Sequence, residues 1–115
     1  MTAARLVVCL ACIIAGEAGN CDVRTQIATA HVAANRNAAG ILGGWYGYAA
    51  PTETSRYIAQ WYRLADDPTH GALMLVSDDD LPLVEPFTRH MRETWTGSQC
   101  DNEQRLHAFA RQGTP

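Results

Sequence analysis

The feature that most constrains the fold of this chain is an uninterrupted apolar run near its start. The ten residues from Leu6 to Ala15 contain no charged side chain, and cysteine is their most polar member. A helix that is apolar on nearly every side is buried in a folded protein, so the run predicts a core helix over residues 4–15. Gly16 and Gly19 bracket its expected end. Ten residues are too few to cross a bilayer, and we therefore expect no membrane span.

The same run has a second interpretation. Arg5 followed by apolar residues is also typical of a secretory signal peptide, which would be removed from the mature protein. The segment Ala15–Ala18 places Glu17 where small residues should precede a cleavage site, and this favours a retained helix. Under the alternative, residues 1–18 would be lost and the chain would be a non-catalytic secreted protein.

Composition narrows the class of protein further. The chain has 115 residues, of which 47% are hydrophobic and 18% charged, so a single globular domain over residues 1–115 is expected. Its net charge is −3, and all nine basic residues are scattered arginines. Without a basic run to neutralise phosphates, a nucleic-acid partner is not expected.

The first half of the chain predicts two further helices. Asn20 or Asp22 can cap a helix that runs to about Asn37, and a loop over residues 38–52 contains four glycines. Thr52 can cap the next helix. Helical spacing within it places two aromatic side chains in the core, Trp61 and Tyr62.

The second half predicts less regular structure. Residues 66–71 form a turn signal, and residues 72–76 predict a short buried strand. Pro82 and Pro86 indicate an irregular stretch. Asp101 and Gln104, spaced as in a capping box, predict a last helix. The whole is expected to be a mostly helical α+β domain with a small β element.

Glu17 is the residue that most strongly suggests chemistry. It follows the apolar run directly, and its neighbours Gly16, Ala18 and Gly19 are small. Partial burial and the negative end of a helix dipole both favour the protonated form of a carboxyl. A carboxyl that stays protonated near neutral pH can act as the acid in glycosidic bond cleavage. The alternative is a solvated glutamate in a helix-ending turn.

Three segments occur in an order that is typical of one family. Leu10–Gly19 is an apolar helix ending in G-E-A, Gln26–Arg36 contains A-T-A-H-V-A-A-N-R, and Asp67–Ala72 reads D-P-T-H-G-A. Together they span roughly residues 5–77, and they resemble the cell wall hydrolase family of the SleB type, which includes spore-cortex-lytic enzymes. The loop that begins at Trp45 and the strand that follows Ala72 differ from the usual pattern of that family.

The resemblance implies a lysozyme-like fold and lytic activity on peptidoglycan. It makes Glu17 the catalytic acid of the G-E-A motif, and Thr69 a substrate contact on the opposite wall of the cleft. Four further residues match the family motifs and are expected to support the site: Asn35, Arg36, Asp67 and Gly71.

The number of candidate catalytic carboxyl groups favours transglycosylation over hydrolysis. Ordinary glycosidases use two carboxyl groups, and the sequence shows no evident second catalytic carboxyl to act with Glu17. Glu53 and the run Asp78–Asp80 lie in polar, turn-like segments that are usually solvated. A lytic transglycosylase can work with one acid, because the 6-hydroxyl of the sugar is the nucleophile. Hydrolysis by a muramidase remains the other outcome.

Aromatic residues in the glycine-rich loop are candidates for sugar binding. Trp45, Tyr46 and Tyr48 can stack on the apolar faces of pyranose rings. Trp45 could equally fill the core beneath the loop. His31 lies on the expected inner face of its helix, where it is either a core histidine or a contact near the cleft.

No metal or cofactor is expected. The four histidines lack zinc-site spacing, and Asp78–Asp80 lacks the alternation of a calcium loop. Cys9 and Cys12 lie within the apolar run and are interpreted as buried hydrophobic residues. Cys21 and Cys100 could form a disulfide if the fold brings them together, which the sequence leaves open.

The sequence therefore predicts a metal-independent lytic transglycosylase whose partners are peptidoglycan glycan strands. Such an enzyme acts at the cell wall, in a periplasmic, extracellular or phage-associated setting, and so short a chain would fit within a phage particle or larger complex. The alternative class is a non-catalytic secreted or wall-binding protein.

Overall fold

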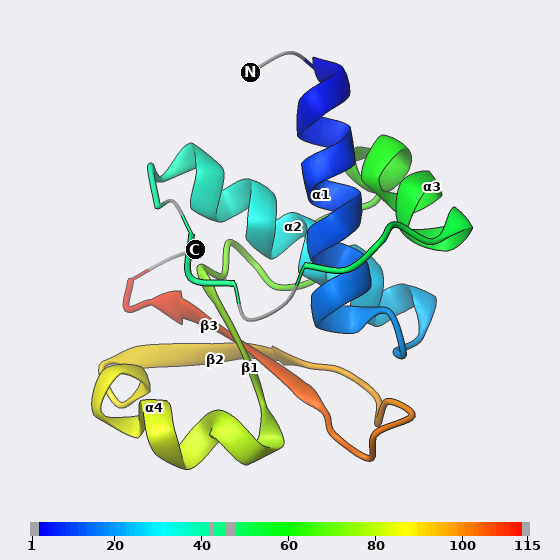
Figure 1. The fold of residues 1–115 in the computed structure, drawn as a ribbon. Helices are drawn as coiled ribbons and strands as arrows, with labels where there is room; N and C mark the ends of the chain where they lie inside the picture. Colours follow the sequence, from blue (N-terminus) through cyan, green and yellow to red (C-terminus); the bar gives the residue numbers. More distant parts are fainter. Residues whose placement is uncertain (1–2, 42, 46–47, 114–115) are drawn as a thin grey trace.

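Helices and a small antiparallel sheet form two layers in the computed structural model, which describes residues 3–41, 43–45 and 48–113 (Figure 1). The α-helices in these ranges are α1 (Ala3–Ala18), α2 (Val23–Ala38), α3 (Glu53–Trp61) and α4 (Leu81–Thr88). The strands are β1 (Met74–Ser77), β2 (Met91–Thr96) and β3 (Leu106–Arg111), and two 3-10 helices are η1 (Tyr62–Leu64) and η2 (Asp78–Asp80). This confirms the predicted α+β domain, mostly helical with a small β element.

The sheet has the order β1-β3-β2, with both pairs antiparallel. Met74 pairs with Phe109 and Ser77 with Leu106, so all of β1 pairs with the first four residues of β3. The β2 ladder shifts register between Glu93 and Trp95, which marks a bulge. As the central strand, β3 is the most deeply covered strand of the sheet.

Helix α2 packs on two sides at once. Ala30 and Ala33 belong to a cluster with α1 and α3, while Val32 packs with Ala72 and Ala108 at the sheet. Alanines let neighbouring elements approach the helix axis closely, and this explains why so small a domain can cover the helix on both sides. Figure 1 shows α2 lying between the other N-terminal helices and the sheet.

Helix α1 is longer than the sequence predicts, and this changes where Glu17 lies. The expected end at residue 15 was wrong: the helix continues through Gly16 to Ala18, so Glu17 belongs to its last turn. The chain turns at Gly19, whose N–H donates to the carbonyl of Ala15 at 3.1 Å. A Cβ at Gly19 would lie 2.3 Å from that same oxygen, and only glycine fits there without a shift. In the described part of the chain, no helix has the length and apolarity that a bilayer crossing requires.

The predicted helix starts are confirmed. The carboxylate of Asp22 accepts a hydrogen bond from the N–H of Thr25 at 2.8 Å and caps α2. Thr52 caps α3 in a capping box with Ser55, in which each side chain accepts from the backbone of the other residue. Capping residues give a local signal, so sequence alone locates them well.

Two predictions for the C-terminal half were wrong. The stretch expected to be irregular forms α4, because Pro82 lies in its first turn, where its missing N–H costs nothing. The predicted last helix is instead β3. Gln104 does not close a capping box; its side chain accepts from the N–H of Asp79, on the segment that follows β1. Pairing with β1 on one side and β2 on the other outweighs the local helix signal.

Two predictions of buried side chains were also wrong, those for Trp61 and Cys9. Trp61, expected in the core, is the last residue of α3 and is 51% exposed. Tyr62 is half-buried against the α1–α2–α3 cluster. Cys9 is exposed and Cys12 half-buried, and both are free thiols, so the first of them is not the buried hydrophobic residue that was expected.

An ionic contact joins β2, β3 and η2. The imidazole of His107 on β3 has its Nε2 2.5 Å from Asp78 Oδ1 on η2 and its Nδ1 2.6 Å from Glu93 Oε1 on β2. Burial by itself lowers the pKa of His107, but the hydrogen bonds and negative charges of the two carboxylates outweigh it and raise that pKa above 6.5. Chiefly through the hydrogen bond with His107, the pKa of Asp78 is lowered from 3.8.

This contact predicts a pH-dependent stability. A raised folded-state pKa for His107 means that its stabilisation is complete below 6.5 and is lost as pH rises through the folded-state value. The free energy of unfolding of the wild type should therefore fall as pH rises above 6.5, and His107→Gln should flatten that fall. Urea unfolding across this range measures it, with the exposed His90→Gln as the control. Parallel curves for wild type and His107→Gln would contradict the prediction.

Candidate active site

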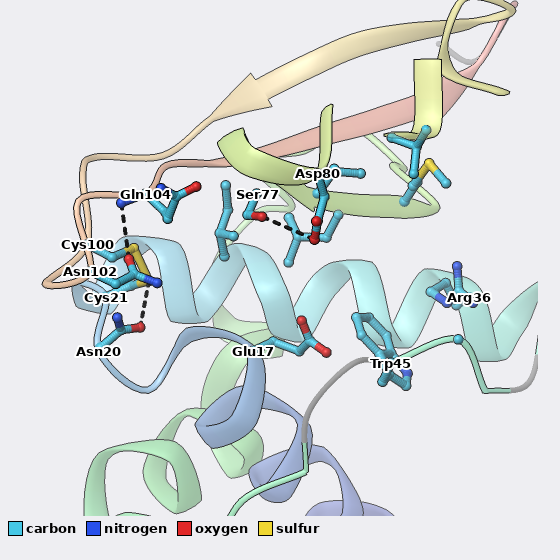
Figure 2. Close-up of a pocket in the computed structure, with 16 residues that line it drawn as sticks. Glu17, Asn20, Cys21, Arg36, Trp45, Ser77, Asp80, Cys100, Asn102 and Gln104 are labelled. Carbon is cyan, nitrogen blue, oxygen red and sulfur yellow. Dashed lines mark hydrogen bonds between the residues drawn. A yellow bond between two sulfur atoms is a disulfide. The ribbon is translucent and has the colours of Figure 1, made fainter. Parts of the chain in front are cut away.

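A pocket of about 410 Å³ opens between the end of α1, the C-terminal part of α2 and the sheet (Figure 2). Glu17 lies on one wall, and β1 with η2 forms the wall opposite. Its polar and aromatic lining is drawn from segments far apart in the sequence: Glu17, Asn20, Arg36, Trp45, Ser77, Asp80, Asn102 and Gln104.

Glu17 reaches the pocket because of how α1 ends. The last turn of the helix points its side chain toward the sheet, as Figure 2 shows, and the turn at Gly19 follows immediately. The side chain is half-buried. Its neighbour Ala18 is fully buried, which fixes the rotation of the turn that carries the carboxyl. The predicted acid thus lies inside a pocket at the negative end of an apolar helix.

The opposite wall contains a carboxyl group that sequence reasoning set aside. Asp80, expected to be solvated, is half-buried and lines the pocket, while its neighbour Asp79 is exposed. The hydroxyl of Ser77 donates to Asp80 Oδ2 at 3.3 Å. Asp80 therefore lines the same pocket as Glu17, which the sequence did not predict. The run of three aspartates hid this, because its members face different directions.

Arg36 anchors the loop that brings Trp45 to the pocket. Its guanidinium donates to the carbonyls of Leu73 and Gly43, both at 2.8 Å, and so links two backbone segments. The same guanidinium lies 5.2 Å from the centroid of the Trp45 ring. Gly44 has a φ of +78° and its Cβ position would be 2.7 Å from the Arg36 Nη2, so this approach requires glycine.

Trp45 packs in the core and also lines the pocket. Its ring packs against the cluster shared by the three N-terminal helices and against the cluster under the sheet. It also lines the pocket beside Glu17. One face of the ring therefore belongs to the core while the residue still contributes apolar surface to the pocket.

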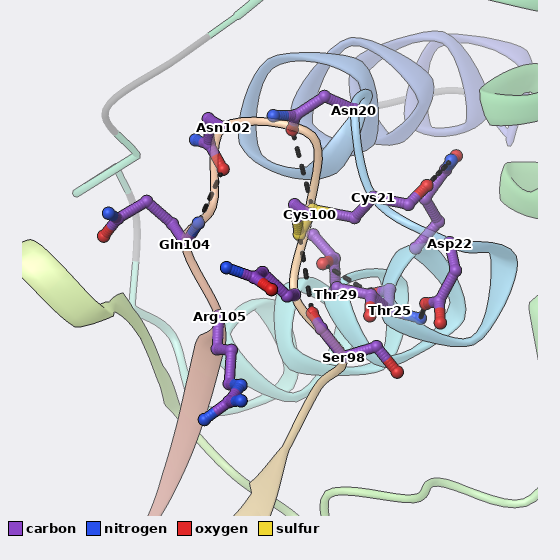
Figure 3. Close-up of a disulfide and its surroundings, with 12 residues drawn as sticks. Asn20, Cys21, Asp22, Thr25, Thr29, Ser98, Cys100, Asn102, Gln104 and Arg105 are labelled. Atoms are coloured by element: carbon purple, nitrogen blue, oxygen red, sulfur yellow. Dashed lines mark hydrogen bonds between the residues drawn. A yellow bond between two sulfur atoms is a disulfide. The ribbon is translucent and has the colours of Figure 1, made fainter.

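A disulfide closes the end of the pocket nearest the turn after α1 (Figure 3). Cys21 and Cys100 are bonded, which settles the pairing that the sequence left open. Beside them, the N–H of Asp101 donates to the carbonyl of Asn20 at 3.1 Å. Three side-chain amides line this end, and sequence reasoning found none of them: Asn20, Asn102 and Gln104. The disulfide and this backbone hydrogen bond join the two segments that carry them.

The D-P-T-H-G-A segment stabilises the turn before β1 and is not among the residues that line the pocket. Asp67 accepts four hydrogen bonds of 2.7 to 2.9 Å, from the hydroxyl and N–H of Thr69, the N–H of Gly71 and the amide of Asn35. Asn35 also donates to the carbonyl of Ala72 at 3.1 Å. Burial raises the pKa of Asp67, but these hydrogen bonds outweigh it, and the net direction is downward from 3.8. The motif holds the turn that leads into β1.

The remaining predicted contacts lie away from this pocket. Thr69 is fully buried against Asp67, and His31 is buried with its Nε2 3.1 Å from the carbonyl of Tyr62. Tyr48 is exposed and lines a second cavity next to α1. Tyr46 lies outside the described residues. Of the predicted substrate contacts, the structure brings Trp45 to Glu17.

In the described part of the chain, no group of three or more histidine, cysteine, aspartate or glutamate side chains is arranged to hold a metal ion. What the pocket offers chemically is two carboxyl groups on facing walls, an indole ring and several amides, which can bind and protonate a neutral polar molecule.

Comparisons with known proteins add no assignment: no protein-family model, curated protein or solved structure matches this chain.

The role of Asp67 predicts a change in stability. Asp67→Asn replaces one acceptor oxygen with an NH₂ group that faces other donors, so the free energy of unfolding should fall by about 1–3 kcal/mol. Because the folded-state pKa is lowered, the stabilisation is present above 3.8 and is lost as pH falls through the folded-state value. Chemical unfolding at neutral pH measures the loss, with the exposed neighbour in Asp66→Asn as the matched control. Equal effects of the two substitutions would contradict the role.

Proposed function

We propose that this protein is a peptidoglycan-cleaving lytic transglycosylase that uses Glu17 as its catalytic acid. The observation that carries the proposal is the position of Glu17: a half-buried carboxyl at the end of an apolar helix, lining a pocket whose other wall is a small sheet. The resemblance to the SleB type of cell wall hydrolase, in three ordered motifs, supports the same role and a lysozyme-like arrangement.

The reaction follows from one carboxyl group that donates and then accepts a proton. Glu17 protonates the oxygen that links C1 of N-acetylmuramic acid to O4 of N-acetylglucosamine, and the C1–O bond breaks. The 6-hydroxyl of the muramic acid then bonds to C1, and its proton passes to the Glu17 carboxylate. The products are a 1,6-anhydro end and a free 4-hydroxyl, and the enzyme returns to its starting protonation state. The nucleophile is part of the substrate, so no water has to be positioned.

The lining of the pocket suits an amino sugar. N-acetyl and hydroxyl groups need neutral donors and acceptors, and Asn20, Asn102 and Gln104 supply them at one end. Trp45 adds an apolar surface on which a pyranose ring can stack.

The disulfide supports action outside a reducing compartment. Disulfides form and persist in secreted and periplasmic proteins and are rare in the cytosol. The Cys21–Cys100 bond holds the end of the pocket where the amides gather. A protein built in this way fits an enzyme that meets its substrate at the cell wall.

A second outcome of cleavage is hydrolysis by a muramidase. The observation that favours it is Asp80, a second carboxyl in the same pocket, which could serve an attacking water. The two outcomes leave different products. Mass spectrometry of the released muropeptides separates them, because transglycosylation gives anhydro ends and hydrolysis gives reducing ends.

Removal of the acid should abolish lysis. Glu17→Gln keeps the shape of the side chain but can no longer donate and reclaim a proton, so clearing of purified sacculi should fall by about a hundredfold or more. The variant should unfold at nearly the wild-type temperature. Glu53→Gln, at an exposed position on α3, is the matched control and should keep full activity. Equal clearing by Glu17→Gln and wild type would end the proposal, and the non-catalytic wall-binding alternative would then stand.

The stacking role of Trp45 should appear in binding. In the Glu17→Gln background, which holds substrate without cleaving it, Trp45→Phe should bind a chitin-type oligosaccharide within a few-fold of the parent. Trp45→Leu should bind about tenfold more weakly, because the flat ring is lost. Isothermal calorimetry measures both, and Trp61→Leu, on an exposed ring away from the pocket, is the control. Unchanged affinity for Trp45→Leu would assign the ring to the core alone.

A further inference from the structure

We propose that Asp80 is a second catalytic carboxylate, which contacts the sugar whose bond is cleaved and stabilises positive charge at its anomeric carbon. The inference rests on the proposed function, and it assigns a role to a residue that the sequence motifs do not include. Among the described residues that line the pocket, Glu17 and Asp80 are the two that carry carboxyl groups.

The two carboxyl groups come from opposite walls. Glu17 projects from the last turn of α1, and Asp80 from η2 at the far end of β1. In Figure 2, Asp80 lies on the sheet side of the pocket and Glu17 on the α1 side. A sugar bound between these walls would have the acid on one side and Asp80 on the other.

The three consecutive aspartates of η2 have separate tasks. Asp78 is engaged by His107 and by the N–H of Arg105, which donates to its Oδ2 at 2.9 Å. Asp79 is exposed, and its N–H donates to the side-chain oxygen of Gln104 at 2.9 Å. Both contacts tie η2 to the segment that leads into β3. Asp80 is the member that turns to the pocket, and its position is therefore fixed by bonds that do not use its own carboxylate.

The hydrogen bond from Ser77 orients that carboxylate further. The hydroxyl of Ser77 lies 3.3 Å from Asp80 Oδ2, and both residues line the pocket. A carboxylate anchored by a neighbouring donor and by a rigid 3-10 turn does not need to reorganise during the reaction. Preorganised charge of this kind stabilises a transition state more than a mobile surface group does.

Glycosidic cleavage gives the carboxylate its task. As the C1–O bond breaks, the ring develops oxocarbenium character, with positive charge shared by C1 and the ring oxygen. A half-buried carboxylate nearby lowers the energy of that state more than the energy of the neutral ground state. No bond forms to Asp80 and no proton moves to it, so the role is compatible with attack by the 6-hydroxyl.

The test compares Asp80→Asn with Asp79→Asn, a matched change one residue away on an exposed side chain. Turnover of a soluble glycan oligomer should give a kcat about a hundredfold lower for Asp80→Asn, with KM changed by less than about threefold. Asp79→Asn should match the wild type, and Glu17→Gln should be inactive. Thermal unfolding of each variant confirms the fold.

A second variant keeps the test decisive if the amide disturbs η2. Asp80→Ala opens a space at the carboxylate position, and added formate should restore part of the lost kcat there but not in Glu17→Gln or wild type. Equal kcat for Asp80→Asn and Asp79→Asn would overturn the proposal, as would a folded Asp80→Ala that does not respond to formate. An active Glu17→Gln would instead overturn the proposed function. The two failures are thus distinguishable.

Discussion

The structure depends on one helix that is buried on two sides. Helix α2 presents Ala30 and Ala33 to α1 and α3, and Val32 to the sheet, so both hydrophobic clusters share it. A chain of this length can cover a central helix only when the contacting side chains are small, because there is little material to surround it. Helices α1 and α3 cover one side of α2, and the sheet covers the other.

That packing also creates the pocket. Helix α1 covers one side of α2 and the sheet covers another, so the end of α1 and the far end of β1 meet across a gap that neither fills. Asn35 and Arg36, one turn from the C-terminal end of α2, hold the segment before β1 and the loop that carries Trp45: Asn35 binds the turn before β1, and Arg36 binds the backbone at Leu73 and the loop at Gly43. The disulfide fixes the other end. The pocket is therefore a product of rigid packing and of crosslinks at its two ends.

Local signals predicted what depends on a few neighbouring residues. Asp22 and Thr52 were recognised as helix caps because capping needs only the next three residues, and Glu17 was recognised by the apolar helix before it. The signals that failed were local ones overridden by distant partners. Asp101 and Gln104 suggested a helix start, yet pairing with β1 and β2 makes the following residues a strand. Asp80 lay in an acidic run, and nothing local distinguished it from Asp79.

The sequence by itself determined that an apolar helix would carry a glutamate at its end, that α2 would follow its aspartate cap, and that the domain would be mostly helical with a small β element. These follow from periodicity, glycine placement and capping, which act within a few residues. Only the tertiary structure decided what faces Glu17: the wall with Asp80, the amides beside the Cys21–Cys100 bond, and Trp45 held over Arg36. Those contacts join residues tens of positions apart, and their geometry is set by how the layers pack, which no local pattern encodes.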